Sequence, residues 1–119
     1  MSESDHQAAL VKWFKIRWPE YVIHSIPNGT HIRSFKGRQK AKNEGLYKGV
    51  SDLFIVVPRG TYHGFYLEMK DEGKKESSLT PEQKSFIQYA RWAGYHADWA
   101  AGVDEARKKI LEYMSLKKH

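Results

Sequence analysis

The sequence contains no cysteine, which excludes a disulfide framework and any zinc site built on thiolates. It contains no apolar run close to the roughly 20 residues that a membrane-spanning helix requires. Its first residues, Met-Ser-Glu-Ser-Asp-His, are polar and acidic, whereas a secretory signal begins with basic and then apolar residues. We therefore expect a cytoplasmic protein without a membrane partner, and no motif in it predicts an organic cofactor.

What the sequence does contain is a surplus of positive charge. It has 20 lysine and arginine residues against 14 aspartate and glutamate residues, which gives a formal net charge of +6. A surplus of this kind favours a polyanionic partner such as nucleic acid, although many basic proteins bind none. The length of 119 residues suffices for one hydrophobic core and not for two, so residues 1–119 are expected to form a single domain.

Two apolar runs in residues 49–70 predict the central feature of the fold, an antiparallel hairpin. Both runs are rich in Val, Ile, Phe and Tyr, and the Pro-Arg-Gly-Thr sequence between them favours a turn. If the chain folds back about Gly60, residues whose numbers add up to 120 lie opposite each other, and Asp52 then faces Glu68. Lys70 shares the face of Glu68, because side chains alternate along a strand.

Two carboxylates side by side on a sheet repel each other, so the hairpin predicts a bound cation. Oxygen ligands without cysteine or a closely spaced histidine pair indicate Mg²⁺ or Mn²⁺ rather than structural zinc. A divalent ion there would serve phosphodiester hydrolysis, with Lys70 beside it to orient the attacking water or to stabilise the phosphate. A Glu-x-Lys pair on a strand is more often a solvated ion pair, but its combination with Asp52 favours the catalytic interpretation.

The opening residues predict a helix from about residue 4 to residue 18. Its buried stripe is expected to consist of Gln7, Leu10, Phe14 and Trp18, which recur at steps of three and four residues. Glu3 extends this stripe by one turn and could complete the shell of ligands around the ion. The alternative is that Glu3 is a first-turn carboxylate that the helix dipole stabilises.

A basic segment follows a predicted strand at residues 21–26 and a Pro-Asn-Gly turn at residues 27–29. This insertion spans about residues 30–48, has few core-forming residues and is expected to be helical in part. It is either a solvated surface helix or an arm that binds phosphates. Its basic side chains include His31, Arg33, Lys36, Arg38, Lys40 and Lys42.

The strongest local signal is the helix start Thr-Pro-Glu-Gln, in which Thr80 is the expected N-cap and Gln83 closes a capping box. Gln83 is also expected on the inward stripe of this helix, where it could hydrogen-bond water or the Lys70 amine. A last strand at residues 95–100 and an amphipathic helix at residues 103–114 complete the order. This order predicts an α/β protein with a mixed sheet of about four strands, in which the last pair is parallel.

Three motifs taken together resemble the virus-type replication-repair nuclease (VRR-NUC) domain, a branch of the PD-(D/E)xK superfamily. They are Gly49-Val50-Ser51-Asp52, Glu68-Met69-Lys70 and Leu79-Thr80-Pro81-Glu82-Gln83, and the likeness extends to Glu3, Gln7 and the Pro27-Asn28-Gly29 turn. The resemblance implies a restriction-endonuclease-like αβββαβ core with a mixed central sheet flanked by helices, and metal-dependent cleavage of DNA. One departure is Ser51, which stands where the superfamily usually has proline.

By residue, the resemblance implies that Asp52, Glu68 and Glu3 bind the metal and that Lys70 is the catalytic lysine, with Gln83 in support. It further implies a preference for branched DNA, such as four-way junctions or flaps, in the cytoplasm of a bacterial or phage-infected host cell. A domain this small is expected to pair two active sites in a homodimer. The expected DNA contacts are Asn28, Arg33, Lys36, Arg38, Lys40 and Lys42.

Two other functions are open at this point. The chain could be a non-catalytic nucleic-acid-binding module that uses the basic segment 31–42, with carboxylates that are structural. It could also be a protein-interaction domain whose charge is incidental, and binding to DNA would then be absent at any salt concentration. Base sequence, strand polarity and RNA cleavage cannot be predicted, because backbone contacts carry little sequence information.

Overall fold

The computed structural model describes residues 1–29 and 32–118, so His31 of the basic segment lies outside the described residues. The elements within this part of the chain have the predicted order. They are α1 (Glu3–Arg17), β1 (Ile23–Ser25), α2 (Phe35–Asn43), β2 (Leu53–Ile55), β3 (Phe65–Lys70), the 3₁₀ turn η1 (Glu76–Ser78), α3 (Pro81–Trp92), β4 (His96–Ala101) and α4 (Val103–Met114).

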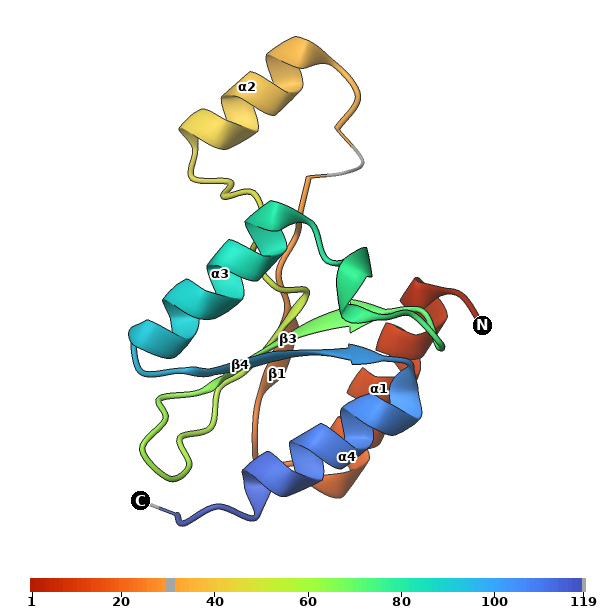
Figure 1. Ribbon diagram of the computed structural model, residues 1–119, viewed down its shortest axis with the longest axis vertical. Helices are drawn as coiled ribbons and strands as arrows, with labels where there is room; N and C mark the ends of the chain where they lie inside the picture. The colour runs from red at the N-terminus through yellow and green to blue at the C-terminus, as the bar shows by residue number, and fades with distance from the viewer. Residues whose placement is uncertain (30–31, 119) are drawn as a thin grey trace.

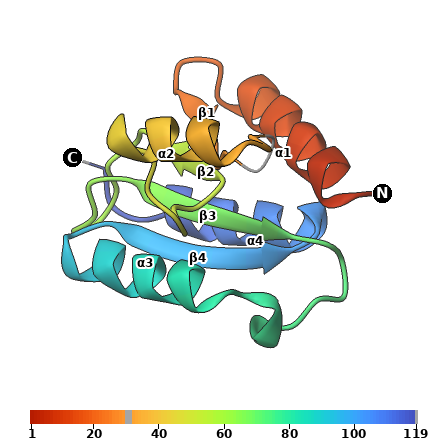
Figure 2. The same cartoon turned by 90° about the horizontal axis from the view of Figure 1, so that it is seen from above.

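A four-stranded sheet lies between two helical layers (Figure 2). Helices α1 and α4 cover one face, where Leu10 and Phe14 pack with Ile110 and with strand residues such as Leu67. Helix α3 covers the other face, to which it contributes Ile87. The predicted α/β architecture, a mixed central sheet flanked by helices, is therefore confirmed.

The strands follow one another across the sheet in chain order, β1-β2-β3-β4. The first two pairs are antiparallel, whereas β3 and β4, which α3 connects, are parallel as predicted. Leu53 lies opposite Leu67 and Ile55 opposite Phe65, so the numbers of paired residues add up to 120 and the predicted register is correct. The first two strands are shorter than predicted, so residues 56–64 connect β2 to β3. The predicted turn about Gly60 lies at the tip of this loop, where the backbone groups of Arg59 and Tyr62 pair in antiparallel fashion on either side of Gly60 and Thr61.

Helix α1 begins one residue earlier than predicted, at Glu3. Ser2 Oγ accepts a hydrogen bond from the backbone N–H of Asp5, and the Asp5 carboxylate accepts one from the backbone N–H of Ser2, which closes a capping box. The predicted buried stripe is wrong at Gln7, which is partly exposed, because the buried residue of this turn is His6. His6 packs inward, where its Nδ1 accepts a 3.0 Å hydrogen bond from the first backbone N–H of α4.

Helix α2 stands apart from the sheet at one end of the molecule (Figure 1). Ser34 is its N-cap and accepts a hydrogen bond from the backbone N–H of Gly37. None of its residues is buried, and Phe35 is 76% exposed. The prediction of a partly helical basic insertion with little core is correct. An isolated helix this short is only marginally stable through its own hydrogen bonds.

Helix α3 starts with the predicted capping box. Thr80 Oγ1 accepts a hydrogen bond from the backbone N–H of Gln83, and the Gln83 side-chain oxygen accepts one of 2.9 Å from the backbone N–H of Thr80. Strand β4 and helix α4 follow within one residue of their predicted bounds. Among the described residues, no helix combines the length and apolar character needed to cross a lipid bilayer.

Candidate metal centre

Three carboxylates from separate elements meet near the carboxyl end of β3. Glu3 is the first residue of α1, Asp52 directly precedes β2, and Glu68 lies within β3. One oxygen atom from each of them lies within 4.8 Å of the others. In Figure 2 the arrowheads of β3 and β4 point to the end of the molecule where α1 begins, so residues far apart in the sequence come together there.

Asp52 is held in place by its neighbouring strands. Its Oδ2 accepts a hydrogen bond of 2.8 Å from the backbone N–H of Met69. Its carbonyl oxygen accepts another of 2.8 Å from the backbone N–H of Ile26, just beyond β1. These two bonds set the Asp52 carboxylate beside β3, next to Glu68, which is the arrangement that the hairpin register predicts.

Glu68 is the most deeply buried of the three carboxylates, with 2% of its surface exposed. Burial raises the pKa of Glu68 to about 9, and a hydrogen bond and charge repulsion from Asp52 act in the same direction. The Lys70 ammonium lowers this pKa, but by less. Without a metal ion the Glu68 carboxyl is therefore protonated at neutral pH, and a cation in the cluster would take the place of the proton.

Glu3 is exposed at the rim of the cluster, and its pKa is also raised. The main cause is the partial burial of its carboxyl group, although the residue as a whole is exposed. The Lys70 ammonium opposes the rise in pKa, and the Asp52 carboxylate adds to it. Lys70 ends β3 on the same face as Glu68, because the residue between them, Met69, points into the hydrophobic core. The centre therefore combines three acidic groups with one amine.

The donor set fits a hard divalent cation. Carboxylate oxygens are the ligands that Mg²⁺ and Mn²⁺ prefer, and the three carboxylates are close enough together to share one ion. The raised pKa of Glu68 is a second observation in favour, since it marks a position that cannot accommodate negative charge unaided. An ion bound by Glu3, Asp52 and Glu68 would remove this electrostatic cost.

The remaining predicted site residues are not part of the carboxylate cluster. Gln83 is half-buried in the first turn of α3, where its side-chain oxygen is engaged in the capping box. Asn28 is exposed in the turn after β1. The roles of these residues in catalysis or DNA binding stay predictions. So do those of the exposed side chains on α2 and just before it, Arg33, Lys36, Arg38, Lys40 and Lys42.

Two residues that shape the centre were not predicted from the sequence. His6 lies one turn along α1 from Glu3, and its hydrogen bond to the start of α4 fixes the end of α1 that carries Glu3. A lone histidine beside an apolar stripe gives no signal of such a role. Asp71 lies outside the cluster of three carboxylates, but its charge raises the pKa of Glu3. Its place directly after Lys70, at the end of the Glu-x-Lys motif, is a signal that could have found it.

Comparison with known proteins agrees with these motifs. The family model of the VRR-NUC domain matches residues 1–104. A solved structure described as a VRR_NUC domain protein is similar, with a TM-score of 0.81 and 28% sequence identity over 99% of this chain and 92% of that chain. None of the curated proteins matches. With a family match over most of its length and the same fold as that relative, the chain belongs to the VRR-NUC domain family.

Proposed function

We propose that this protein is a Mg²⁺- or Mn²⁺-dependent DNA endonuclease. The observation that carries the proposal is the cluster of Glu3, Asp52 and Glu68, with Lys70 at its edge. Membership of the VRR-NUC family supports a nuclease function. The net charge of +6 and the exposed cations of α2 favour a polyanionic substrate.

Each residue of the centre has a role that follows from its position. Glu3, Asp52 and Glu68 would hold the divalent ion, which when bound polarises the phosphate and lowers the pKa of a water molecule. Glu68 gives up its proton on binding, so ion affinity rises with pH. The backbone N–H of Met69 holds the Asp52 carboxylate in its orientation. Lys70 orients the attacking water and neutralises negative charge that develops on the phosphate.

The basic helix α2 supplies contacts to the DNA backbone. Its sequence, Phe-Lys-Gly-Arg-Gln-Lys-Ala-Lys-Asn, contains four cations and no carboxylate. Contacts of this kind position a substrate and add affinity that falls with salt, but they do not read its sequence. Arg33 and Asn28, which lie near the entry to the insertion, would contribute in the same way.

Selectivity for branched DNA and assembly as a homodimer belong to the same proposal. A four-way junction offers two equivalent strands, and a dimer with twofold symmetry presents two identical sites to them. Light scattering at micromolar protein, with and without a junction, measures the mass of the assembly. A monomeric mass under both conditions would contradict the dimer and leave the chemistry of the single site untouched.

Cleavage assays address the central proposal. Purified protein is incubated with four-way junction, flap and linear duplex DNA in Mg²⁺, in Mn²⁺ and in EDTA. We expect cleavage with either metal, most of it on branched substrates, and none in EDTA. Lys70→Ala should bind DNA without cutting it, whereas Lys15→Ala, at an exposed position on α1, should cut as the wild type does. Absence of cleavage on every substrate with both metals would refute the proposal.

A non-catalytic nucleic-acid-binding module is the second candidate. It is favoured by a basic helix, α2, that buries none of its residues in the protein. Under this alternative DNA affinity depends on α2, and no substrate is cut. Lys70→Ala separates the two functions, because both kinds of protein would keep their DNA affinity but only an enzyme has a cleavage rate to lose.

A further inference from the structure

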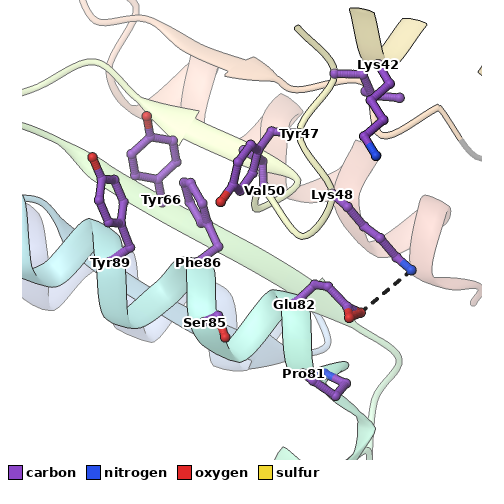
Figure 3. Close-up of a pocket in the computed structure, with 11 residues that line it drawn as sticks. Lys42, Tyr47, Lys48, Val50, Tyr66, Pro81, Glu82, Ser85, Phe86 and Tyr89 are labelled. Atoms are coloured by element: carbon purple, nitrogen blue, oxygen red, sulfur yellow. Dashed lines mark ion pairs between the residues drawn. The ribbon is translucent and has the colours of Figure 1, made fainter. Parts of the chain in front are cut away.

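An aromatic groove lies close to the metal centre and has no part in the chemistry described so far. It has a volume of about 930 Å³ and runs between α3, β3 and the chain that leads from α2 to β2. Its volume lies in the range of pockets that bind small organic ligands. Four aromatic rings line it, those of Tyr47, Tyr66, Phe86 and Tyr89 (Figure 3).

Two chain segments connect this groove with the carboxylates. Tyr66 precedes Glu68 by two residues on the same face of β3, which is a distance of roughly 7 Å along a strand. Val50 lines the groove and precedes Asp52 by two residues. A separation of roughly 7 Å is also about the rise of two nucleotides along one DNA strand. A nucleotide in the groove would therefore be a near neighbour of a phosphate at the metal centre.

The charged residues of the groove favour a nucleic-acid strand. Lys42 and Lys48 lie towards one end, away from the rings of Tyr66 and Tyr89 (Figure 3). Among the described residues that line the groove, Glu82 is the one carboxylate, and Lys48 pairs with it at 3.8 Å. Aromatic faces next to cations are typical of sites for unpaired bases, because a base stacks on a ring while the cations attract its phosphate.

A second copy of this chain fits the groove less well than DNA does. Helix α2 lies at the groove through Lys42, and its nine residues include four cations and no carboxylate. A twofold contact centred on the groove would bring two such helices together. Like charges that face each other across an interface are unfavourable. Charge complementarity therefore points to a polyanion as the occupant.

We propose that this groove binds an unpaired nucleobase of the DNA next to the scissile phosphate, an inference that rests on the nuclease function proposed above. It identifies the structural feature of the substrate that the protein recognises, namely a base that is free to leave the stack. Flaps, single-stranded ends and the open centres of junctions present such bases. In a closed duplex a base must first be extruded, which disfavours binding.

Binding measurements in EDTA test the groove without any cleavage. The probes are a fluorescein-labelled single-stranded oligonucleotide and a strand of the same length and charge in which abasic sites replace the bases. Tyr47 and Tyr89 are 70% and 61% exposed, so Tyr47→Ala and Tyr89→Ala should leave the fold intact. We expect each variant to bind the base-containing strand roughly five- to 150-fold more weakly, the effect of one stacked base, with unchanged binding of the abasic strand. Tyr89→Phe keeps the ring and should bind as the wild type does.

Ile16→Ala is the control, because Ile16 is an apolar residue of α1 that is 72% exposed and lies outside the groove. Unchanged binding in the two tyrosine variants, equal losses on both strands, or the same loss in Ile16→Ala would overturn the assignment. So would tyrosine variants that become monomeric while base-dependent binding persists, since the groove would then be a protein interface. Failure of the nuclease proposal would show itself differently, as absent cleavage with base-dependent binding intact.

Discussion

The buried carboxyl of Glu68 allows a quantitative prediction about the metal centre. Folding moves the pKa of this group from its ordinary value of 4.5 to about 9, chiefly because burial penalises the charged form. The folded protein then binds more protons than the unfolded chain between these two values, so the free energy of unfolding falls as the pH rises. The metal-free protein should therefore be more stable at pH 5 than at pH 8.

The size of the effect follows from the same two values. A shift of one pKa unit corresponds to about 1.4 kcal/mol. When the pH of the solution rises from 4.5, the ordinary pKa of this group, to 7, the protein therefore loses roughly 3 kcal/mol of stability through Glu68. Glutamine has nearly the same shape and does not titrate. Glu68→Gln should remove this part of the pH dependence and should be up to about 3 kcal/mol more stable than the wild type at pH 7 in EDTA.

Urea unfolding in EDTA at pH 5, 6, 7 and 8 measures these free energies. Glu20→Gln, at an exposed position, is the control and should keep the wild-type slope. A smaller slope should persist in Glu68→Gln, because the pKa of Glu3 is raised as well. Mn²⁺ should stabilise the wild type most at high pH and should do little for the variant. Equal pH dependence of wild type and Glu68→Gln would refute the reasoning.

Other substitutions probe the ligand set, the basic helix and the core. Glu3→Gln should raise the Mn²⁺ concentration for half-maximal cleavage at least about tenfold, and an unchanged metal requirement would exclude Glu3 from the ligands. Lys40→Ala should lower the slope of log affinity for DNA against log salt by about 0.9, as measured by fluorescence anisotropy, if its ammonium contacts one phosphate. Phe14→Ala should cost about 3–5 kcal/mol in urea unfolding, because this side chain is fully buried in the core; a loss near zero would contradict the packing. Ser51→Ala should raise stability by about 1 kcal/mol, since Ser51 Oγ is buried without a hydrogen-bond partner among the described residues, and a lower stability would reveal one.

Local chemistry explains which parts of the fold could be predicted. The two apolar runs around Gly60 set the strand register, since a slip of one residue would turn the buried side chains of β3 towards the wrong face. The start of α3 was predictable because Thr80 and Gln83 satisfy each other's backbone N–H groups. The burial of His6 was not predictable. It depends on a backbone N–H 97 residues further along the chain, which no periodicity in α1 reveals.

The candidate site, too, could be predicted only in part from local sequence patterns. That Asp52 and Glu68 are neighbours follows from strand pairing, but the raised pKa of Glu68 depends on how deeply the folded protein buries it. The aromatic groove was not predicted, because its walls meet only in three dimensions. At Gly49 a Cβ atom would approach the carbonyl oxygen of Glu82 to 2.4 Å, a close contact between the chain before β2 and the first turn of α3 that no local pattern indicates.

The exposure of α2 bears on how this protein can diversify. Most substitutions that unfold proteins act through buried side chains, and α2 has none. Its charge and length can therefore change without weakening the core or displacing the carboxylates. New substrate preferences, whether selected in nature or engineered, can arise in this helix while the hydrolytic centre stays as it is.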